Sequence, residues 1–343
     1  MSRNAIAAMA AYTLELRAAD IKLNQNESPF DFPQELKAEV FRRIEARGWN
    51  LYPDFETQAL REALAKAYGL AAENILTGNG SNELLAAAIG AFVAPGTPVI
   101  FPRPTFSLYE KLVTIAGGLA VPVDFEPDSG ALPLARMLEA ATPGSVVIVC
   151  SPNNPTGGVL AEGGLDALLA TGATIFFDRA YGDFADDALP PLHDRLVTFS
   201  TFSKSYSLAG LRLGWIASTA KTCTEIRKVK LPYSLNIFSE AAAIVALENP
   251  WIRERNVAQL VTERERVLRA MAELPRLTLF PTRANFIAFR PQRNCLELFE
   301  ELIARGILIR NVSAYPQMQN CLRVSIGTPE QNDRFLAALK ELA

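Results

Sequence analysis

Histidine is almost absent from this chain of 343 residues, which contains only His193. A Ser-His-Asp triad or a multi-histidine zinc site would depend on that single residue, so the sequence argues against both. Cysteine is also scarce, and none of the four has the spacing of metal ligands: Cys150, Cys223, Cys295 and Cys321. A chain of this length has no need of a disulfide framework, so a reducing cytoplasm is the simplest location and no metal is expected.

Long apolar runs and a strong excess of one charge are lacking too. No run of residues has the length and apolar character of a membrane span. The formal net charge is −3, whereas nucleic-acid binders are usually basic. Glu15 and Asp20 follow soon after the first apolar residues, which favours an amphipathic helical arm over a signal peptide. We expect neither a membrane nor a nucleic acid as a partner.

Short apolar runs alternate with helical patterns through the first part of the chain. Hydrophobic residues make up 49% of the sequence and charged residues 21%, an ordinary globular composition. Ala- and Leu-rich helical stretches occur at 83–92 and 162–169. Near-continuous apolar runs, typical of strands covered on both faces, occur at 99–101, 146–150, 174–178, 197–200 and 214–217. This alternation predicts an α/β fold with a mostly parallel sheet.

The character of the chain changes at Trp251. The stretch 251–271 has a helical pattern with many charges of alternating sign, which is typical of a solvated linking helix. Apolar runs follow at 286–289, 307–309 and 322–326, with helical stretches between and after them. Together they predict a smaller α+β domain. We predict three parts, namely an N-terminal arm that packs with the small domain or a partner subunit, a large domain and a small domain, at 1–28, 29–248 and 249–343.

Lys204 is the candidate for reactive chemistry. It follows the predicted strand at 197–200, within TFSKSYSLAGLRLG, a run rich in small and hydroxyl residues. Partial desolvation there would lower the pKa of the lysine and leave a neutral nucleophile that can form an imine. Thr201, Ser203 and Arg212 could bind a phosphate. An ordinary lysine in a surface loop is the alternative.

Three further segments carry polar residues where α/β sheets place ligands. Asn154 follows the strand at 146–150 within SPNNPTGG, where its amide could donate to a phenolate oxygen or simply form an Asn-Pro turn. Asp178 ends an apolar strand, so its carboxylate needs a partner such as a protonated pyridine nitrogen or an arginine. Ser81 and Asn82 follow glycines at the start of an apolar helix, which suits phosphate binding or a plain helix cap.

In this order, the segments resemble fold-type I enzymes that use pyridoxal 5′-phosphate (PLP). The resemblance is to the class I and II aminotransferases and, within them, to the histidinol-phosphate aminotransferases. It covers nearly the whole chain and rests on eight segments: LNQNESP at 23–29, LYPD at 51–54, GNGSNEL at 78–84, PTFSLY at 104–109, SPNNPTG at 151–157, DRAY at 178–181, TFSKSYSLAGLRLG at 201–214 and CLRVSIGT at 321–328. It implies a homodimer in which a large domain has a mostly parallel seven-stranded sheet between helices, next to a smaller α+β domain.

The resemblance implies a role for each candidate residue. Lys204 would hold PLP as a Schiff base and shuttle the proton of the substrate Cα, while Asp178 would pair with the pyridine nitrogen. Asn154 and Tyr181 would bind the ring hydroxyl oxygen, and Phe106 would stack on the ring. The cofactor phosphate would be held by Ser81, Asn82, Thr201, Ser203, Arg212 and, from the neighbouring subunit, Tyr52.

The substrate depends on a smaller set of residues. Arg310 and Arg323 match the two arginines with which histidinol-phosphate enzymes bind the substrate phosphate, and Tyr12 and Asn24 match further substrate contacts. The resemblance thus implies amino transfer from histidinol phosphate to 2-oxoglutarate, in histidine biosynthesis. Arg310 could instead be a surface residue, and Arg323 alone could bind the carboxylate of an aromatic amino acid in an aromatic amino-acid aminotransferase. A threonine-phosphate decarboxylase of the same fold would also need phosphate-binding arginines.

Two positions depart from the family pattern. Asn82 stands where the family often has Asp, and Arg179 stands where many relatives have Glu or another small or polar residue. Arg179 could compete for the carboxylate of Asp178, but the alternation of side chains predicts that it points to the opposite side.

A PLP-fold binding module of a regulator would need a DNA-binding domain ahead of LNQNESP, and about two dozen residues precede that segment. A degenerate non-enzyme is disfavoured because the main cofactor residues are present.

Overall fold

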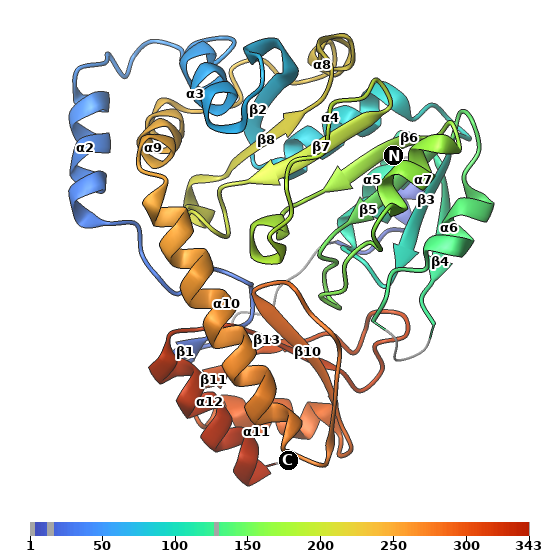
Figure 1. Cartoon of the computed structure of the whole chain (residues 1–343), viewed down its shortest axis with the longest axis vertical. Helices are drawn as coiled ribbons and strands as arrows, with labels where there is room; N and C mark the ends of the chain where they lie inside the picture. Colours follow the sequence, from blue (N-terminus) through green and yellow to red (C-terminus); the bar gives the residue numbers. More distant parts are fainter. Residues whose placement is uncertain (1–3, 12–16, 127–129, 343) are drawn as a thin grey trace.

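The largest sheet of the computed structural model, which describes residues 4–11, 17–126 and 130–342, has seven strands (Figure 1). Their order is β2-β8-β7-β6-β5-β3-β4, and only β8 runs antiparallel to its neighbours. The strands are β2 (Ile75–Asn79), β3 (Pro98–Arg103), β4 (Leu119–Asp124), β5 (Val146–Cys150), β6 (Thr174–Asp178), β7 (Leu196–Thr201) and β8 (Leu213–Ala217). The predicted α/β class and mostly parallel seven-stranded sheet are confirmed.

Five strands correspond to the predicted apolar runs: β3, β5, β6, β7 and β8. They lie inside the sheet, where both faces are covered, so most of their residues are apolar and buried. The two strands without a prediction, β2 and β4, lie at the sheet edges. β2 ends in Thr77, Gly78 and Asn79, and β4 contains Pro122 and is largely half exposed. β2 therefore has no continuous apolar run, and in β4 the proline within the apolar run weakens the strand signal.

Helices cover both faces of the large sheet. One face packs against α4 (Ser81–Phe92), α5 (Leu108–Ala116) and α8 (Ala220–Arg227). The other face packs against α6 (Leu134–Ala140) and α7 (Gly164–Ala170) at one end, and α3 (Gln58–Tyr68) and α9 (Ile237–Glu248) at the other. An outer helix, α2 (Gln34–Glu45), lies on α9. Short 3-10 turns occur at η1 (Ala72–Asn74), η2 (Gly182–Ala185) and η3 (Ala209–Leu211).

The C-terminal part contains a second sheet of four antiparallel strands in the order β12-β13-β10-β9. Its strands are β9 (Leu277–Leu279), β10 (Phe286–Pro291), β12 (Arg310–Asn311) and β13 (Leu322–Ser325), accompanied by α11 (Cys295–Ala304) and α12 (Pro329–Leu342). The predicted linking helix corresponds to α10 (Trp251–Ala272), which runs from the region of the large sheet into this part (Figure 1). The smaller α+β unit is thus present, and the domain boundaries given above stay a prediction.

The N-terminal arm contacts the C-terminal part through a short parallel pair. β1 (Ile21–Lys22) pairs with β11 (Ile307–Leu308). Within the described residues of the arm, helix is limited to α1 (Asn4–Ala7), shorter than the predicted arm helix. No helix in the described ranges combines the length and the hydropathy that a membrane span requires.

Candidate active site

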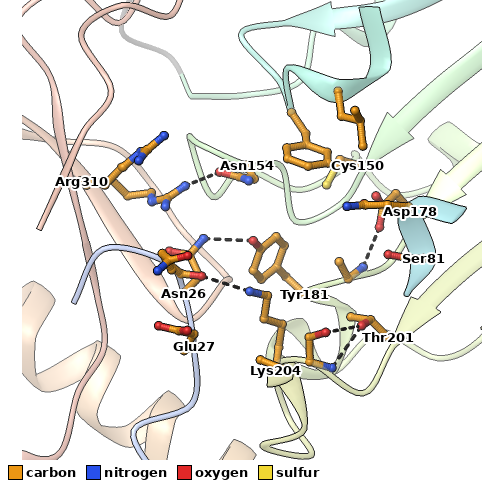
Figure 2. Close-up of a pocket in the computed structure, with 18 of the residues that line it drawn as sticks. Asn26, Glu27, Ser81, Cys150, Asn154, Asp178, Tyr181, Thr201, Lys204 and Arg310 are labelled. Carbon is orange, nitrogen blue, oxygen red and sulfur yellow. Dashed lines mark hydrogen bonds between the residues drawn. The ribbon is translucent and has the colours of Figure 1, made fainter. Parts of the chain in front are cut away.

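A cavity of about 610 Å³ lies at the carboxyl ends of β5, β6 and β7, between the large sheet, the segment 24–27 and β12-β13. Open α/β sheets bind ligands at this edge. All predicted cofactor residues except Tyr52 line the cavity, as do three of the four predicted substrate residues (Figure 2): Ser81, Asn82, Phe106, Asn154, Asp178, Tyr181, Thr201, Ser203, Lys204, Arg212, Asn24, Arg310 and Arg323. Residues that are far apart in the chain therefore converge on one space.

Lys204 extends from the turn after β7 into this cavity. Its Nζ donates a hydrogen bond to the Gln25 carbonyl oxygen at 3.1 Å and lies 5.8 Å from the centre of the Tyr181 ring. Burial, together with the positive charges of Arg323 and Arg212, lowers the pKa of Lys204 to about 8, although Glu27 opposes the shift. A substantial fraction of the amine is therefore neutral near pH 8 and can act as a nucleophile.

Asp178 ends β6 as a buried carboxylate held by neutral donors. Its Oδ2 accepts from the Tyr109 hydroxyl at 2.7 Å, and its Oδ1 accepts from the Ala180 N–H at 2.9 Å. Burial raises the pKa of Asp178, and these two hydrogen bonds oppose the rise. A buried carboxylate is costly unless a cation or strong donors compensate it. The site therefore favours a cationic group from a ligand.

Arg179 does not supply that cation. Its guanidinium donates to the Asp187 carbonyl oxygen and lies against Gly182, where an added Cβ would be 3.1 Å from the guanidinium carbon. The side chain thus points away from the Asp178 carboxylate, as the alternation at the strand end predicts.

Two asparagines and Tyr181 form the wall between Lys204 and the small sheet. Asn26 Nδ2 donates to the Tyr181 hydroxyl at 3.0 Å, and Asn154 Oδ1 accepts from Arg323 Nη1 (Figure 2). Arg323 Nη2 also donates to the Asn24 carbonyl oxygen at 3.0 Å. Burial raises the pKa of Tyr181, so its hydroxyl stays protonated and can serve as a donor.

An anion site is built where β2 and β8 meet the start of α4. Gly80 has a positive φ of 81°, and a Cβ there would be 2.8 Å from Arg212 Nη2. A Cβ at Gly214 would be 2.2 Å from the Ser81 backbone nitrogen. Glycine at both positions allows Arg212 and β8 to approach the first turn of α4, whose N–H groups favour anions. Thr201 and Ser203 line the same end, with their hydroxyl oxygens 2.9 Å apart.

Arg310 and Arg323 are direct cross-strand partners in β12 and β13. Opposite residues of an antiparallel pair project from the same face, and like charges placed there repel each other. Arg310 lies on the side of the cavity opposite Ser81 and Thr201 (Figure 2). The cavity therefore has two separate cationic ends, and a bound anion would relieve the repulsion at the Arg310 end.

A family model described as aminotransferase class I and II matches residues 18–339. The chain belongs to this family. It is 36% identical over 329 residues to the histidinol-phosphate aminotransferase of Chlorobaculum parvum, a match that covers 94% of this chain and 92% of the relative. The corresponding enzyme of Aquifex aeolicus is 35% identical over 342 residues and 96% and 95% of the two chains.

Solved structures of aminotransferases share the fold. The histidinol-phosphate aminotransferase of Sinorhizobium meliloti, in complex with pyridoxal-5′-phosphate, superposes with a TM-score of 0.83 at 26% identity, covering 95% of this chain and 91% of that chain. The putative aminotransferase of Burkholderia pseudomallei gives the same TM-score of 0.83 at 26% identity, covering 96% and 99%. The fold-type I assignment is therefore confirmed.

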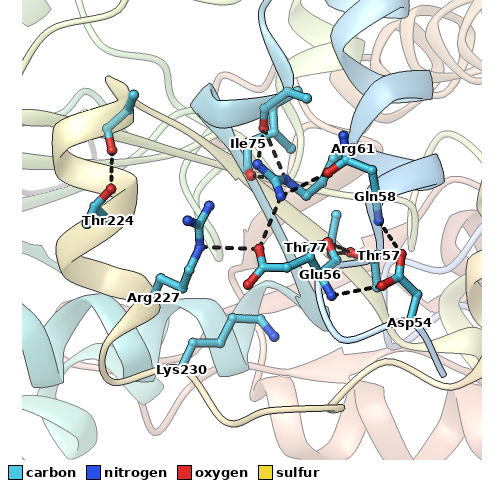
Figure 3. Close-up of polar contacts among 12 residues, drawn as sticks. Asp54, Glu56, Thr57, Gln58, Arg61, Ile75, Thr77, Thr224, Arg227 and Lys230 are labelled. Carbon is cyan, nitrogen blue, oxygen red and sulfur yellow. Dashed lines mark hydrogen bonds and ion pairs between the residues drawn. The ribbon is translucent and has the colours of Figure 1, made fainter. Parts of the chain in front are cut away.

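One described site residue predicted for this aminotransferase, Tyr52, does not line the cavity. Tyr52 is 79% exposed and stacks on Tyr233 at 4.8 Å, away from the cavity of its own chain. Tyr12 lies outside the described residues. The segment that follows Tyr52 is anchored by Asp54, which accepts from the Gln58 N–H at 2.8 Å, and by Glu56, which pairs with Arg61 and Arg227 (Figure 3).

Several cavity residues have no role in the sequence-based prediction. Tyr109 and Asn26 hydrogen-bond directly to Asp178 and Tyr181, and Gln25 and Glu27 surround Lys204. All four lie inside the segments PTFSLY and LNQNESP, so the sequence contains a signal that could have found them. The motifs do not indicate, however, in which direction each side chain points. Tyr315, which also lines the cavity, lies in no recognised segment.

Proposed function

We propose that this aminotransferase uses PLP and transfers the amino group of histidinol phosphate to 2-oxoglutarate, a step of histidine biosynthesis. The observation that carries the proposal is the pairing of Arg310 with Arg323 at one end of the cavity, across from the separate anion site near Ser81. One cationic end suits the cofactor phosphate and the other a phosphorylated substrate. The names of the two bacterial relatives support the same substrate.

The residues of the cavity fit PLP. The buried Asp178 carboxylate, held by neutral donors, complements a protonated pyridine nitrogen. The first turn of α4 with Arg212 complements a phosphate, and Phe106 lies in the cavity wall where it can cover a ring. When bound, PLP supplies an electron-withdrawing ring that stabilises negative charge at the substrate Cα.

The side chains then divide the remaining work. Lys204 Nζ accepts the proton of the substrate Cα, because its pKa of about 8 leaves the neutral amine accessible. Asp178 would hold the proton on the ring nitrogen of bound PLP, and Tyr109 keeps the carboxylate oriented through its 2.7 Å hydrogen bond. Tyr181 and Asn154 would bind the ring oxygen. Arg323 and Arg310 orient the substrate through its phosphate, which places the amine carbon toward Lys204.

We also propose a homodimer in the cytoplasm. Tyr52 is exposed in the single chain and belongs to an aromatic cluster with Phe55 and Tyr233. Leu231 beside this cluster is exposed as well. Exposed apolar groups of this kind favour association with a second copy, in which Tyr52 would reach the partner's cofactor phosphate. Sedimentation equilibrium should give twice the chain mass, and a monomer that is fully active would contradict this assembly.

The decisive test follows the visible band of the bound cofactor as each amino donor is added without an acceptor. Histidinol phosphate should bleach the band at a lower concentration than phenylalanine, tyrosine or threonine phosphate. Lys204→Ala should lack both the band and turnover, whereas Lys221→Ala, an exposed lysine paired with Asp194, should behave as wild type. Wild-type protein that stays colourless with added PLP would refute the cofactor, and a preference for phenylalanine would refute the substrate.

A further inference from the structure

Asn256 is a fully buried amide on α10. Its Nδ2 donates to the Ser205 carbonyl oxygen at 2.9 Å and to the Ser207 Oγ at 2.9 Å, while its Oδ1 accepts from Arg255 Nη2 at 3.1 Å. A buried amide needs such partners, because an unpaired polar group away from water is costly. Two of these contacts join the helix to the turn that carries Lys204.

The turn after Lys204 depends on contacts from outside itself. Ser207 has a φ of 61°, a left-handed conformation that non-glycine residues adopt only when the surroundings hold them. Ser205 Oγ donates to Asp183 at 2.5 Å, so the side chain of Ser205 is held from one side and its carbonyl, by Asn256, from the other. Asn256 thus fixes the backbone on the carboxyl side of Lys204.

The same amide is linked to residues 25–28, the covering segment that lies against the lysine. The Ser207 hydroxyl, which accepts from Asn256, donates in turn to the Ser28 Oγ at 2.9 Å. Ser28 follows Gln25 and Glu27 by one to three positions, and the Gln25 carbonyl is the acceptor for Lys204 Nζ. A continuous row of hydrogen bonds therefore runs from α10 through the lysine turn to the covering segment.

We propose that Asn256, which lies on the linking helix α10, is a positioning residue that holds Lys204 in its place in the cavity. The inference rests on the proposed role of Lys204. The amide ties the turn directly and the covering segment through Ser207 and Ser28. Loss of the amide leaves the Ser205 carbonyl unpaired and lets the left-handed turn relax, which moves Nζ away from the reacting carbon.

The test compares Asn256→Leu with Asn332→Leu. Asn332 is also buried, and its Nδ2 also donates twice, to Glu263 and to the Gly327 carbonyl, but it lies on α12. We expect Asn256→Leu to lower kcat by about 10²-fold with little change in KM, since small misplacements of a reacting group have effects of this order. The rate at which its cofactor-free form gains the visible band on addition of PLP should fall by about tenfold. Asn332→Leu should lose stability without either change.

A second variant keeps the inference testable if Asn256→Leu does not fold. Ser207→Gly preserves the left-handed turn, because glycine adopts positive φ readily, and removes only the hydroxyl of the row. It should lower both kcat and the rate of PLP uptake, each by a smaller factor than Asn256→Leu. Equal rates in Asn256→Leu and Asn332→Leu, or wild-type rates in Ser207→Gly if the former does not fold, would overturn the positioning role. If Lys204→Ala takes up PLP like wild type, the role of Lys204 fails and the inference fails with it.

Discussion

Replacement of Arg310 by alanine should separate phosphate recognition from amino transfer. Arg310 faces Arg323 across β12 and β13, at the end of the cavity away from the Ser81 anion site. A hydrogen bond to a charged group contributes about 1.5–3 kcal/mol, and tenfold corresponds to about 1.4 kcal/mol. The kcat/KM for histidinol phosphate should therefore fall by about 10- to 150-fold. Phenylalanine, which lacks a phosphate, should lose less than about threefold.

Steady-state kcat/KM values for histidinol phosphate and for phenylalanine, in wild type and Arg310→Ala, measure this difference. The folding stability of the variant gives an independent check. Arg310→Ala removes one of two cations that face and repel each other. The free energy of unfolding of this variant without ligand should therefore drop by no more than about 0.5 kcal/mol. Arg305→Ala, at the exposed C-terminal end of α11, controls for the loss of any positive charge. Equal losses with both donors would refute the assignment of Arg310 to the substrate phosphate.

Two further outcomes follow from the site geometry. Because burial lowers the pKa of Lys204 to about 8, the rate of PLP uptake by cofactor-free protein should rise with pH and level off above that value. Stopped-flow absorbance measures this rate, and a rise that continues to the ordinary lysine pKa near 10.5 would contradict the burial. Gly214→Ala would place a methyl 2.2 Å from the Ser81 nitrogen, so denaturant unfolding should show a loss of about 1–3 kcal/mol. Gly210→Ala meets no atom within 4 Å and should cost less than about 0.5 kcal/mol, so equal losses would disprove the close approach of β8.

Local pattern was sufficient for the interior of the large sheet. β5, β6 and β7 are covered by helices on both faces, and their residues are apolar in almost unbroken runs. β2 and β4 lie at the edges, where the polar and glycine residues that end β2 and the proline inside β4 weaken that signal. The polar residues at the ends of interior strands stood out as candidates for a related reason, since a carboxylate such as Asp178 interrupts an apolar run at the edge where α/β sheets bind ligands.

Side-chain direction depended on the tertiary structure. Tyr109 lies on α5, distant in sequence from Asp178, and only helix packing brings its hydroxyl to 2.7 Å from the carboxylate. The register of β12 against β13 decides that Arg310 faces Arg323. The direction of Arg179 is an exception, since the alternation of side chains at the strand end predicts that it points away from Asp178, and only its partner, the Asp187 carbonyl, comes from the tertiary structure.

Local sequence features are enough to predict the α/β fold and the residue types of the site, including Lys204, because apolar periodicity and motif spacing are local properties. The tertiary structure decided which polar groups meet, through hydrogen bonds that join residues far apart in the chain. Asn256 shows the difference most clearly. On α10 it is one polar residue in a charged helical pattern, and only the docking of that helix places its amide against the Ser205 carbonyl, next to Lys204.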